Sequence, residues 1–90
     1  MNESGKPSLS SIAEQVLEEL EALVGCPAEG VTAIRRDDDG WVVTAEILEL
    51  ERVPETTDVL ASYEVTVGED GELTGYRRTH RYVRAQVEER

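Results

Sequence analysis

The hydrophobic pattern of this chain changes period once, at Gly25–Pro27, and that change limits the fold more than any other feature. Before it, eight apolar residues recur at steps of three and four, the spacing that lines one helical face. These residues are Leu9, Ile12, Ala13, Val16, Leu17, Leu20, Leu23 and Val24. After Pro27, apolar and polar residues alternate, as in half-buried strands. The chain is therefore predicted to form one helix followed by strands.

The predicted helix runs from about Leu9 to Val24. Ser8 is a candidate for its N-cap, and Ser11 competes because Ser11 and Glu14 have the spacing of a capping box. Gly25 supplies a left-handed cap at the other end. The apolar stripe is too short for a coiled-coil seam, so we expect it to pack on the strands.

Four strands are predicted after the helix, at residues 31–36, 41–51, 59–67 and 73–84. The turns between them lie at residues 37–40, 54–58 and 68–71, and two of these contain Asp-Gly. Glycine there permits the positive φ of a tight hairpin. The expected fold class is α+β: one N-terminal helix packed on a four-stranded antiparallel β-meander. We expect a flexible N-terminus over 1–7, a single domain over 8–87 and a frayed C-terminus over 88–90.

The last hairpin has two candidate registers. A two-residue loop at Asp70-Gly71 sets Glu64 opposite Arg77, which places opposite charges across the strands. The same register pairs Val65 with Tyr76, Tyr63 with Arg78, and Ser62 with Thr79. A three-residue loop sets Glu64 opposite Tyr76 and loses the charge pair. We favour the two-residue loop.

The second predicted strand is apolar on both faces, although a half-solvated meander needs only one apolar face. One face carries Trp41, Val43, Ala45 and Ile47, and the other carries Val42, Leu48 and Leu50. Either a β-bulge near Glu46–Glu49 exchanges the faces, or a partner chain or second copy covers the extra apolar surface. We favour the bulge.

The net charge of −11 is unevenly distributed, because residues 73–90 carry +3 while every earlier segment is acidic. Opposite signs in so short a chain indicate first that the last strand packs against acidic strands, and second that it recruits an acidic partner. The overall charge argues against nucleic acid or an anionic membrane as the main partner. The chain also lacks an apolar run near the roughly 18 residues that cross a bilayer, and its start lacks a signal-peptide pattern. A cytoplasmic location is predicted.

The residues that carry chemistry are too scattered for a catalytic or metal site. Asp37, Asp38 and Asp39 are contiguous, whereas a calcium loop spreads its ligands over about twelve residues. His80 is the sole histidine and Cys26 the sole cysteine, far apart in sequence, so a zinc site within one chain is not expected. We predict no cofactor, no metal and no enzymatic activity.

The stretch from Gly40 to Arg84 resembles a known family over about half of the chain. The resemblance lies in Gly40-Trp41, Glu46–Asp58 with Arg52-Val53-Pro54 inside it, Leu60-Ala61-Ser62-Tyr63-Glu64-Val65, and Gly75-Tyr76 leading to Arg81-Tyr82. In these segments the chain is similar to the gas vesicle accessory protein O family (GvpO). The resemblance implies a non-enzymatic accessory protein that acts through contacts with other gas vesicle accessory or shell proteins. The alternative is a regulator of the gas vesicle gene cluster that binds nucleic acid through the basic and aromatic last strand.

The predicted working surface is the sheet and its 52–58 loop, because the helix exterior is lined with glutamates. Pro54 stiffens this loop, and Arg52 is expected to bond its carbonyls or Asp58. The candidate partner-binding residues are Leu48, Leu50, Arg52, Pro54, Asp58, Glu64, Arg77 and Arg81. A second copy of the chain is also considered as a partner.

Overall fold

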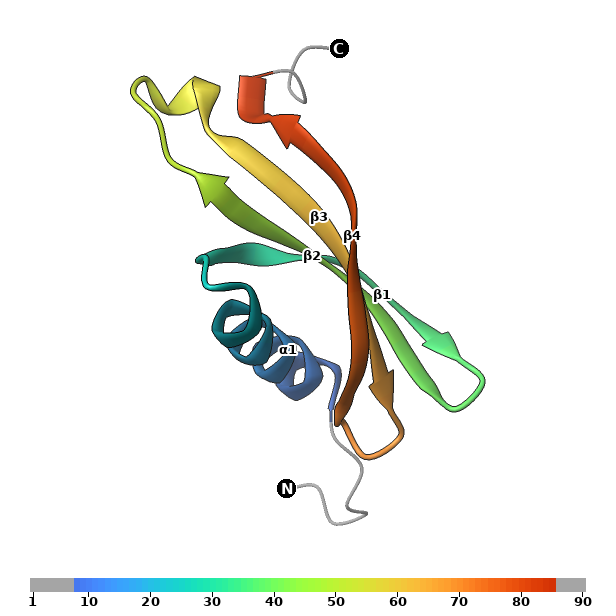
Figure 1. Ribbon diagram of the computed structural model, residues 1–90. Coiled ribbons are helices and arrows are strands. Elements are labelled where there is room, and N and C mark those ends of the chain that lie inside the picture. The colour runs from blue at the N-terminus through green and yellow to red at the C-terminus, as the bar shows by residue number, and fades with distance from the viewer. Residues whose placement is uncertain (1–7, 86–90) are drawn as a thin grey trace.

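The computed structural model describes residues 8–85 and has the predicted α+β architecture (Figure 1). Its elements are α1 (Leu9–Val24), β1 (Ala28–Asp37), β2 (Gly40–Leu50), the 3-10 turn η1 (Glu55–Thr57), β3 (Val59–Gly68) and β4 (Leu73–Val83). The four strands form one antiparallel sheet in the order β1-β2-β3-β4, a meander. The flexible start and frayed end predicted at the termini lie outside the described residues.

The helix α1 has the predicted bounds, with Ser8 as its N-cap. The Ser8 hydroxyl oxygen accepts a hydrogen bond from the backbone N–H of Ser11 at 3.1 Å, so the competing start at Ser11 is not used. Gly25 ends the helix with φ 76°, in the left-handed region that glycine tolerates.

One face of the sheet is covered by α1, which packs mainly on β1 and β2 (Figure 1). The buried stripe of the helix consists of Ile12, Val16 and Leu20. It joins Val43, Ala45, Ile47, Val65 and Val67 in one core cluster. Below, this side of the sheet is called the helix side, and the other is called the helix-free face.

The predicted bulge in β2 is confirmed and lies at Glu49. Leu48 pairs with Leu60, but Leu50 pairs with Val59, so Glu49 is the extra residue. Residues directly opposite each other in neighbouring strands share a face. Leu48 therefore lies half-buried on the helix-free face, whereas Leu50 lies on the helix side.

The last hairpin has the predicted central register with a different loop. The N–H of Gly68 donates to the carbonyl of Glu72 at 2.8 Å, so the loop has three residues and not the predicted two. Gly71 takes φ 89° at its end. A bulge at Thr74 then restores the expected pairing of Glu64 with Arg77.

A second bulge in β4, at Thr79, changes the pairing beyond that point. Tyr63 faces Arg78 as predicted, but Ser62 faces His80 and not Thr79. The prediction for Ser62 was wrong because an extra residue in one strand shifts every later pair by one.

Gly40 does not have the positive φ expected of it, because the first hairpin loop consists of Asp38 and Asp39 and Gly40 already belongs to β2. The glycine is needed there for a different reason. A Cβ at Gly40 would lie 1.8 Å from the carbonyl oxygen of Val67 on the neighbouring strand. Gly40 therefore permits a close approach of two backbones.

Substituting Gly40 tests this close approach. Gly40→Ala should lower the free energy of unfolding by about 1 to 3 kcal/mol, because β2 and β3 must separate to admit the methyl group. Urea unfolding followed by circular dichroism measures the change. Gly68→Ala is the matched control, since its Cβ would find its nearest neighbour at 3.5 Å. Equal stability of the two variants would contradict the explanation.

Candidate functional site

Arg84, just after β4, ties together three segments that are distant in sequence. Its two terminal nitrogens donate to the two carboxylate oxygens of Glu29 in β1, at 3.1 and 3.0 Å. One of them also donates to Asp58 at 3.0 Å, and the backbone N–H of Arg84 donates to the Asp58 carbonyl at 2.9 Å. We call this group of Glu29, Asp58 and Arg84 the arginine clamp. These hydrogen bonds raise the pKa of Arg84.

The Asp58 carboxylate closes the loop between β2 and β3. It is only 3% exposed, and its other oxygen accepts a hydrogen bond from the backbone N–H of Arg52 at 2.8 Å. That bond lowers the pKa of Asp58, helped by Arg84 and opposed by burial. Within the loop, the N–H of Thr57 donates to the Pro54 carbonyl at 3.0 Å. The loop is thus fixed at both ends and across its middle.

Arg52 holds the loop through its backbone N–H, and its side chain makes no hydrogen bond or ion pair within residues 8–85. The sequence analysis expected Arg52 to bond either the loop carbonyls or Asp58. The acceptor is Asp58, and the donor is the backbone N–H of Arg52. The next residue, Val53, is 98% exposed, and Leu50 at the end of β2 is 42% exposed. We call Leu50, Val53, Val59 and Val83 the loop-end patch. In it, Leu50 pairs with Val59, and Val59 pairs with Val83 across the strands.

A second charged cluster surrounds the bulge residue Glu49 on the helix side. Its carboxylate accepts hydrogen bonds from Arg81 at 2.9 Å, Arg78 at 3.1 Å and the Tyr63 hydroxyl at 3.4 Å. Burial alone would raise the pKa of Glu49, but the hydrogen bonds from Arg81 and Arg78 outweigh it and lower that pKa.

Two of the candidate partner-binding residues, Arg77 and Arg81, lie on opposite faces of the sheet. Arg77 bonds Glu64 at 3.0 Å on the helix-free face, whereas Arg81 bonds Glu49 on the helix side. The cause is the bulge at Thr79, which breaks the alternation between the two arginines.

The eight candidate residues therefore divide into two groups. The loop end holds Leu50, Arg52, Pro54 and Asp58, and the helix side of β4 carries Arg81. The helix-free face carries Leu48, Glu64 and Arg77. The basic last strand does pack against acidic strands, as its charge predicted, through Glu29, Glu49, Asp58 and Glu64. The role of the eight residues in partner binding stays a prediction.

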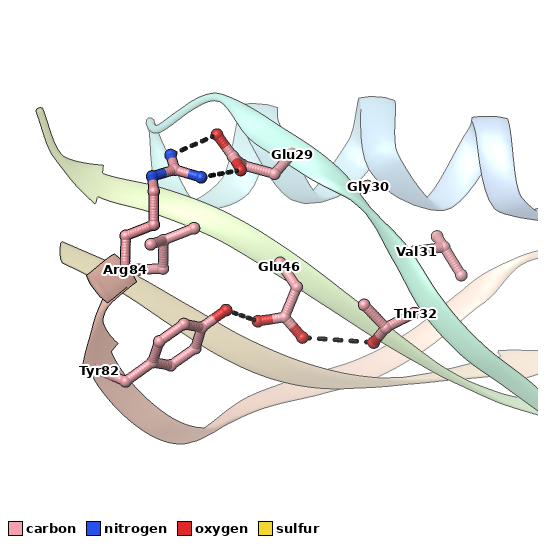
Figure 2. Close-up of a pocket in the computed structure, with 8 residues that line it drawn as sticks. Glu29, Gly30, Val31, Thr32, Glu46, Tyr82 and Arg84 are labelled. Carbon is pink, nitrogen blue, oxygen red and sulfur yellow. Dashed lines mark hydrogen bonds and ion pairs between the residues drawn. The ribbon is translucent and has the colours of Figure 1, made fainter. Parts of the chain in front are cut away.

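The helix-free face contains a hollow of about 380 Å³ near the arginine clamp (Figure 2). Its lining comprises Glu29, Gly30, Val31, Thr32, Glu46, Leu60, Tyr82 and Arg84. The Glu46 carboxylate accepts hydrogen bonds from the hydroxyls of Ser62, Tyr82 and Thr32. Burial and the bond to Glu46 raise the pKa of Tyr82.

The sequence analysis missed this hollow and the role of Arg84. One signal was present, since Glu46 is the sole charged residue in the stretch from Trp41 to Leu48. A carboxylate inside an apolar strand requires hydrogen-bond donors nearby. The sequence could not show that the donors would be hydroxyls from the other three strands.

Membrane and metal features can be judged over the described part of the chain. Within residues 8–85, no helix is both long enough and apolar enough to cross a membrane. The same residues include no group of three or more His, Cys, Asp or Glu side chains arranged to hold a metal ion.

The structure thus defines a small α+β domain with a clamped loop at one end and a lined hollow on its helix-free face. Over residues 1–88 the sequence matches the family described as gas vesicle synthesis protein GvpO. The chain belongs to this family, as its resemblance predicted.

Three relatives are similar over most of this chain. Gas vesicle protein O of Streptomyces sp. strain CB03234 is 45% identical over 80 residues, covering 89% of this chain and 62% of the relative. Gas vesicle protein O1 of Halobacterium salinarum is 32% identical over 82 residues, with coverages of 91% and 69%. Gas vesicle protein O of Haloferax mediterranei is 33% identical over 82 residues, with coverages of 90% and 59%. The chain therefore spans about 60 to 70% of these relatives' lengths. No solved structure matches it.

The lowered pKa of Asp58 predicts acid sensitivity of the fold. A carboxyl with a depressed folded-state pKa stabilises the fold above its unfolded value, about 3.9, and this stability is lost as pH falls through the folded value. In Asp58→Asn this contribution is absent, so the free energy of unfolding should depend less steeply on pH below about 4. Urea unfolding at several pH values measures both slopes. Asp39→Asn, at the exposed hairpin tip, should keep the wild-type slope. Parallel curves for wild type and Asp58→Asn would refute the assignment.

Proposed function

We propose that this chain is a non-enzymatic accessory protein of gas vesicle assembly that acts in the cytoplasm through contacts with other gas vesicle accessory or shell proteins. Membership of the gas vesicle synthesis protein GvpO family supports the process. The names of the three relatives, each a gas vesicle protein O, support it as well. The observation that supports a contact function is the clamped loop, which displays Val53 to solvent.

The loop has the properties of a binding surface because it is already ordered in the free domain, so a partner does not have to order it. The bonds from Arg52 and Arg84 to Asp58 fix the loop before any partner arrives. A pre-organised apolar group loses little conformational entropy on binding, so more of its burial energy becomes affinity. Leu50, three residues before Val53 and 42% exposed, is a second exposed apolar side chain at this end of the sheet. Fully burying one such side chain contributes roughly 1.5 to 3 kcal/mol.

The charged side chains around the loop-end patch support a role in protein contact and not in catalysis. Arg78 and Arg81 are held by Glu49, and Arg84 by Glu29 and Asp58, so these charges serve the fold. A nucleophilic mechanism needs a base that touches a hydroxyl or thiol. His80 is exposed and makes no hydrogen bond to such a group in the described part of the chain. The contact of the Ser62 hydroxyl with the Glu46 carboxylate lies on the helix-free face, away from the loop-end patch.

Vesicle formation in the host tests the proposal directly. Deletion of the gene should abolish or greatly reduce intact vesicles, and Val53→Asp should reduce them strongly because it puts a charge where a partner needs an apolar side chain. Electron microscopy and pressure-sensitive light scattering count the vesicles. Circular dichroism of the purified variant should match wild type, since Val53 is almost wholly exposed.

A matched control comes from the helix, whose exterior is assigned no partner. Charge reversal at Glu14 and Glu18, both exposed, should leave vesicle number unchanged. Normal vesicles in the deletion strain would defeat the proposed process. Loss of vesicles from the helix variant, with Val53→Asp normal, would show that the partner surface lies on the helix and not at the loop end.

Nucleic-acid binding is the competing function, and it should be weak. Arg77, Arg78, Arg81 and Arg84 are each paired with a carboxylate, and the chain as a whole carries −11. We expect a Kd of roughly 10⁻⁴ M or weaker for DNA or RNA at physiological salt. Mobility shift and fluorescence anisotropy measure it. Micromolar, sequence-dependent binding would favour a regulator of the gene cluster.

A further inference from the structure

Glu46 is a half-buried carboxylate held in place by neutral groups. The Ser62 hydroxyl lies 2.8 and 3.0 Å from its two oxygens, and the Thr32 hydroxyl lies 3.3 Å from one of them. The Tyr82 hydroxyl donates to the other. These donors come from β3, β1 and β4, so all four strands fix the direction of this carboxylate. Figure 2 shows the contacts of Tyr82 and Thr32 with it.

The charge of Glu46 has no cationic partner among residues 8–85, unlike that of the other carboxylates nearby. Glu29 and Asp58 are bound by Arg84, and Glu49 is bound by two arginines. A carboxylate offers about four acceptor positions, and three hydroxyls supply at most one proton each, because the Thr32 hydroxyl also lies 3.4 Å from the Thr44 carbonyl oxygen. One acceptor position therefore stays open, and hydroxyl donors leave the charge itself uncompensated.

The hollow beside Glu46 has the volume and the lining residues to take a long side chain. Its wall includes Leu60 and Tyr82, and a neighbouring hollow of about 400 Å³ shares Thr32, Glu46 and Tyr82 with it. The two hollows together form a groove that crosses the sheet from β1 to β4. An apolar wall ending at a carboxylate suits the aliphatic stem and charged head of a basic side chain.

The local and global charges both favour a cation here. Three carboxylates lie at or next to the hollow, those of Glu29, Glu46 and Asp58, against the single guanidinium of Arg84. The chain as a whole carries −11, which attracts basic partners over longer distances. A neutral apolar side chain would fill the space but leave the charge of Glu46 unpaired.

We infer that this groove binds a basic segment of a partner protein, with one lysine or arginine side chain seated in the hollow and its cationic head on Glu46. The inference rests on the proposed function in one respect only, namely that the partner is a protein. The groove lies on the helix-free face and is separate from the loop-end patch.

A peptide pair isolates the contribution of the charge. The full-length protein, labelled with ¹⁵N, is titrated with acetyl-Gly-Ala-Lys-Ala-Gly-amide and with the same peptide carrying norleucine in place of lysine. The lysine peptide should shift the amide signals of Thr32, Glu46 and Tyr82 in a saturable manner, and more weakly as salt rises. Norleucine has a stem of similar length without the charge, so its peptide should cause little change. Equal binding of both peptides would overturn the inference.

Variants of the protein locate the contact. Glu46→Gln keeps the size of the side chain and removes its charge, so it should weaken lysine-peptide binding by about tenfold or more. Glu69→Gln removes an exposed carboxylate of the last hairpin loop that is paired with Arg36 and lies outside the hollow, so it should bind as wild type. Thr32→Trp, at an exposed position of the rim, should block the hollow without changing any charge. Full binding by Glu46→Gln or by Thr32→Trp would refute the site.

The peptide titration and the vesicle experiment test different proposals, so the failure of one can be distinguished from the failure of the other. Peptide binding that depends on Glu46, together with normal vesicles in the deletion strain, would support the groove and defeat the proposed process. No peptide binding, together with vesicle loss in Val53→Asp, would defeat the groove alone.

Discussion

The burial of the apolar stripe of α1 on β1 and β2 is the interaction on which the rest of the structure depends. Ile12, Val16 and Leu20 are fully buried there, each worth roughly 1.5 to 3 kcal/mol of burial. Exposed ion pairs contribute about 0 to 1 kcal/mol each. The helix therefore decides which face of the sheet becomes the core. The helix packs mainly on β1 and β2, and Val65 and Val67 of β3 join the same core. The outer positions of β4 are held by ion pairs and hydroxyls.

Two of the bulges, at Glu49 and at Thr79, determine where those charges lie. The bulge at Glu49 turns a carboxylate of β2 toward the helix side, where it can hold Arg78 and Arg81. The bulge at Thr79 then leaves Arg77 on the helix-free face with Glu64. Without these extra residues the basic side chains of β4 would alternate regularly and could not match the acids of the earlier strands. The ion pairs thus specify register more than they stabilise the fold.

Much of the fold could be predicted because it follows from periodicity and end signals. The helix bounds, the meander and the pairing of Glu64 with Arg77 all came from spacing and charge. The sequence could not predict the length of the last loop, the partner of Ser62 or the reason for Gly40. Each of these depends on an inserted residue or on a backbone contact between strands. For the site, the loop around Pro54 could be predicted from its own residues. The hollow could not, since Glu29, Glu46 and Arg84 come together only through the twist of the sheet (Figure 2).

Arg84 connects the two surfaces, because one guanidinium binds both Glu29 at the hollow and Asp58 at the loop. Its Nε is buried without a hydrogen-bond acceptor in the described part of the chain, so its position rests on those two carboxylates. A change at any of the three residues therefore disturbs the loop and the hollow together. Val53 and Glu46 lie outside the arginine clamp, and each belongs to one surface alone. Separate roles can therefore be assigned to the two surfaces only by substituting residues such as Val53 and Glu46, because these changes leave the arginine clamp intact.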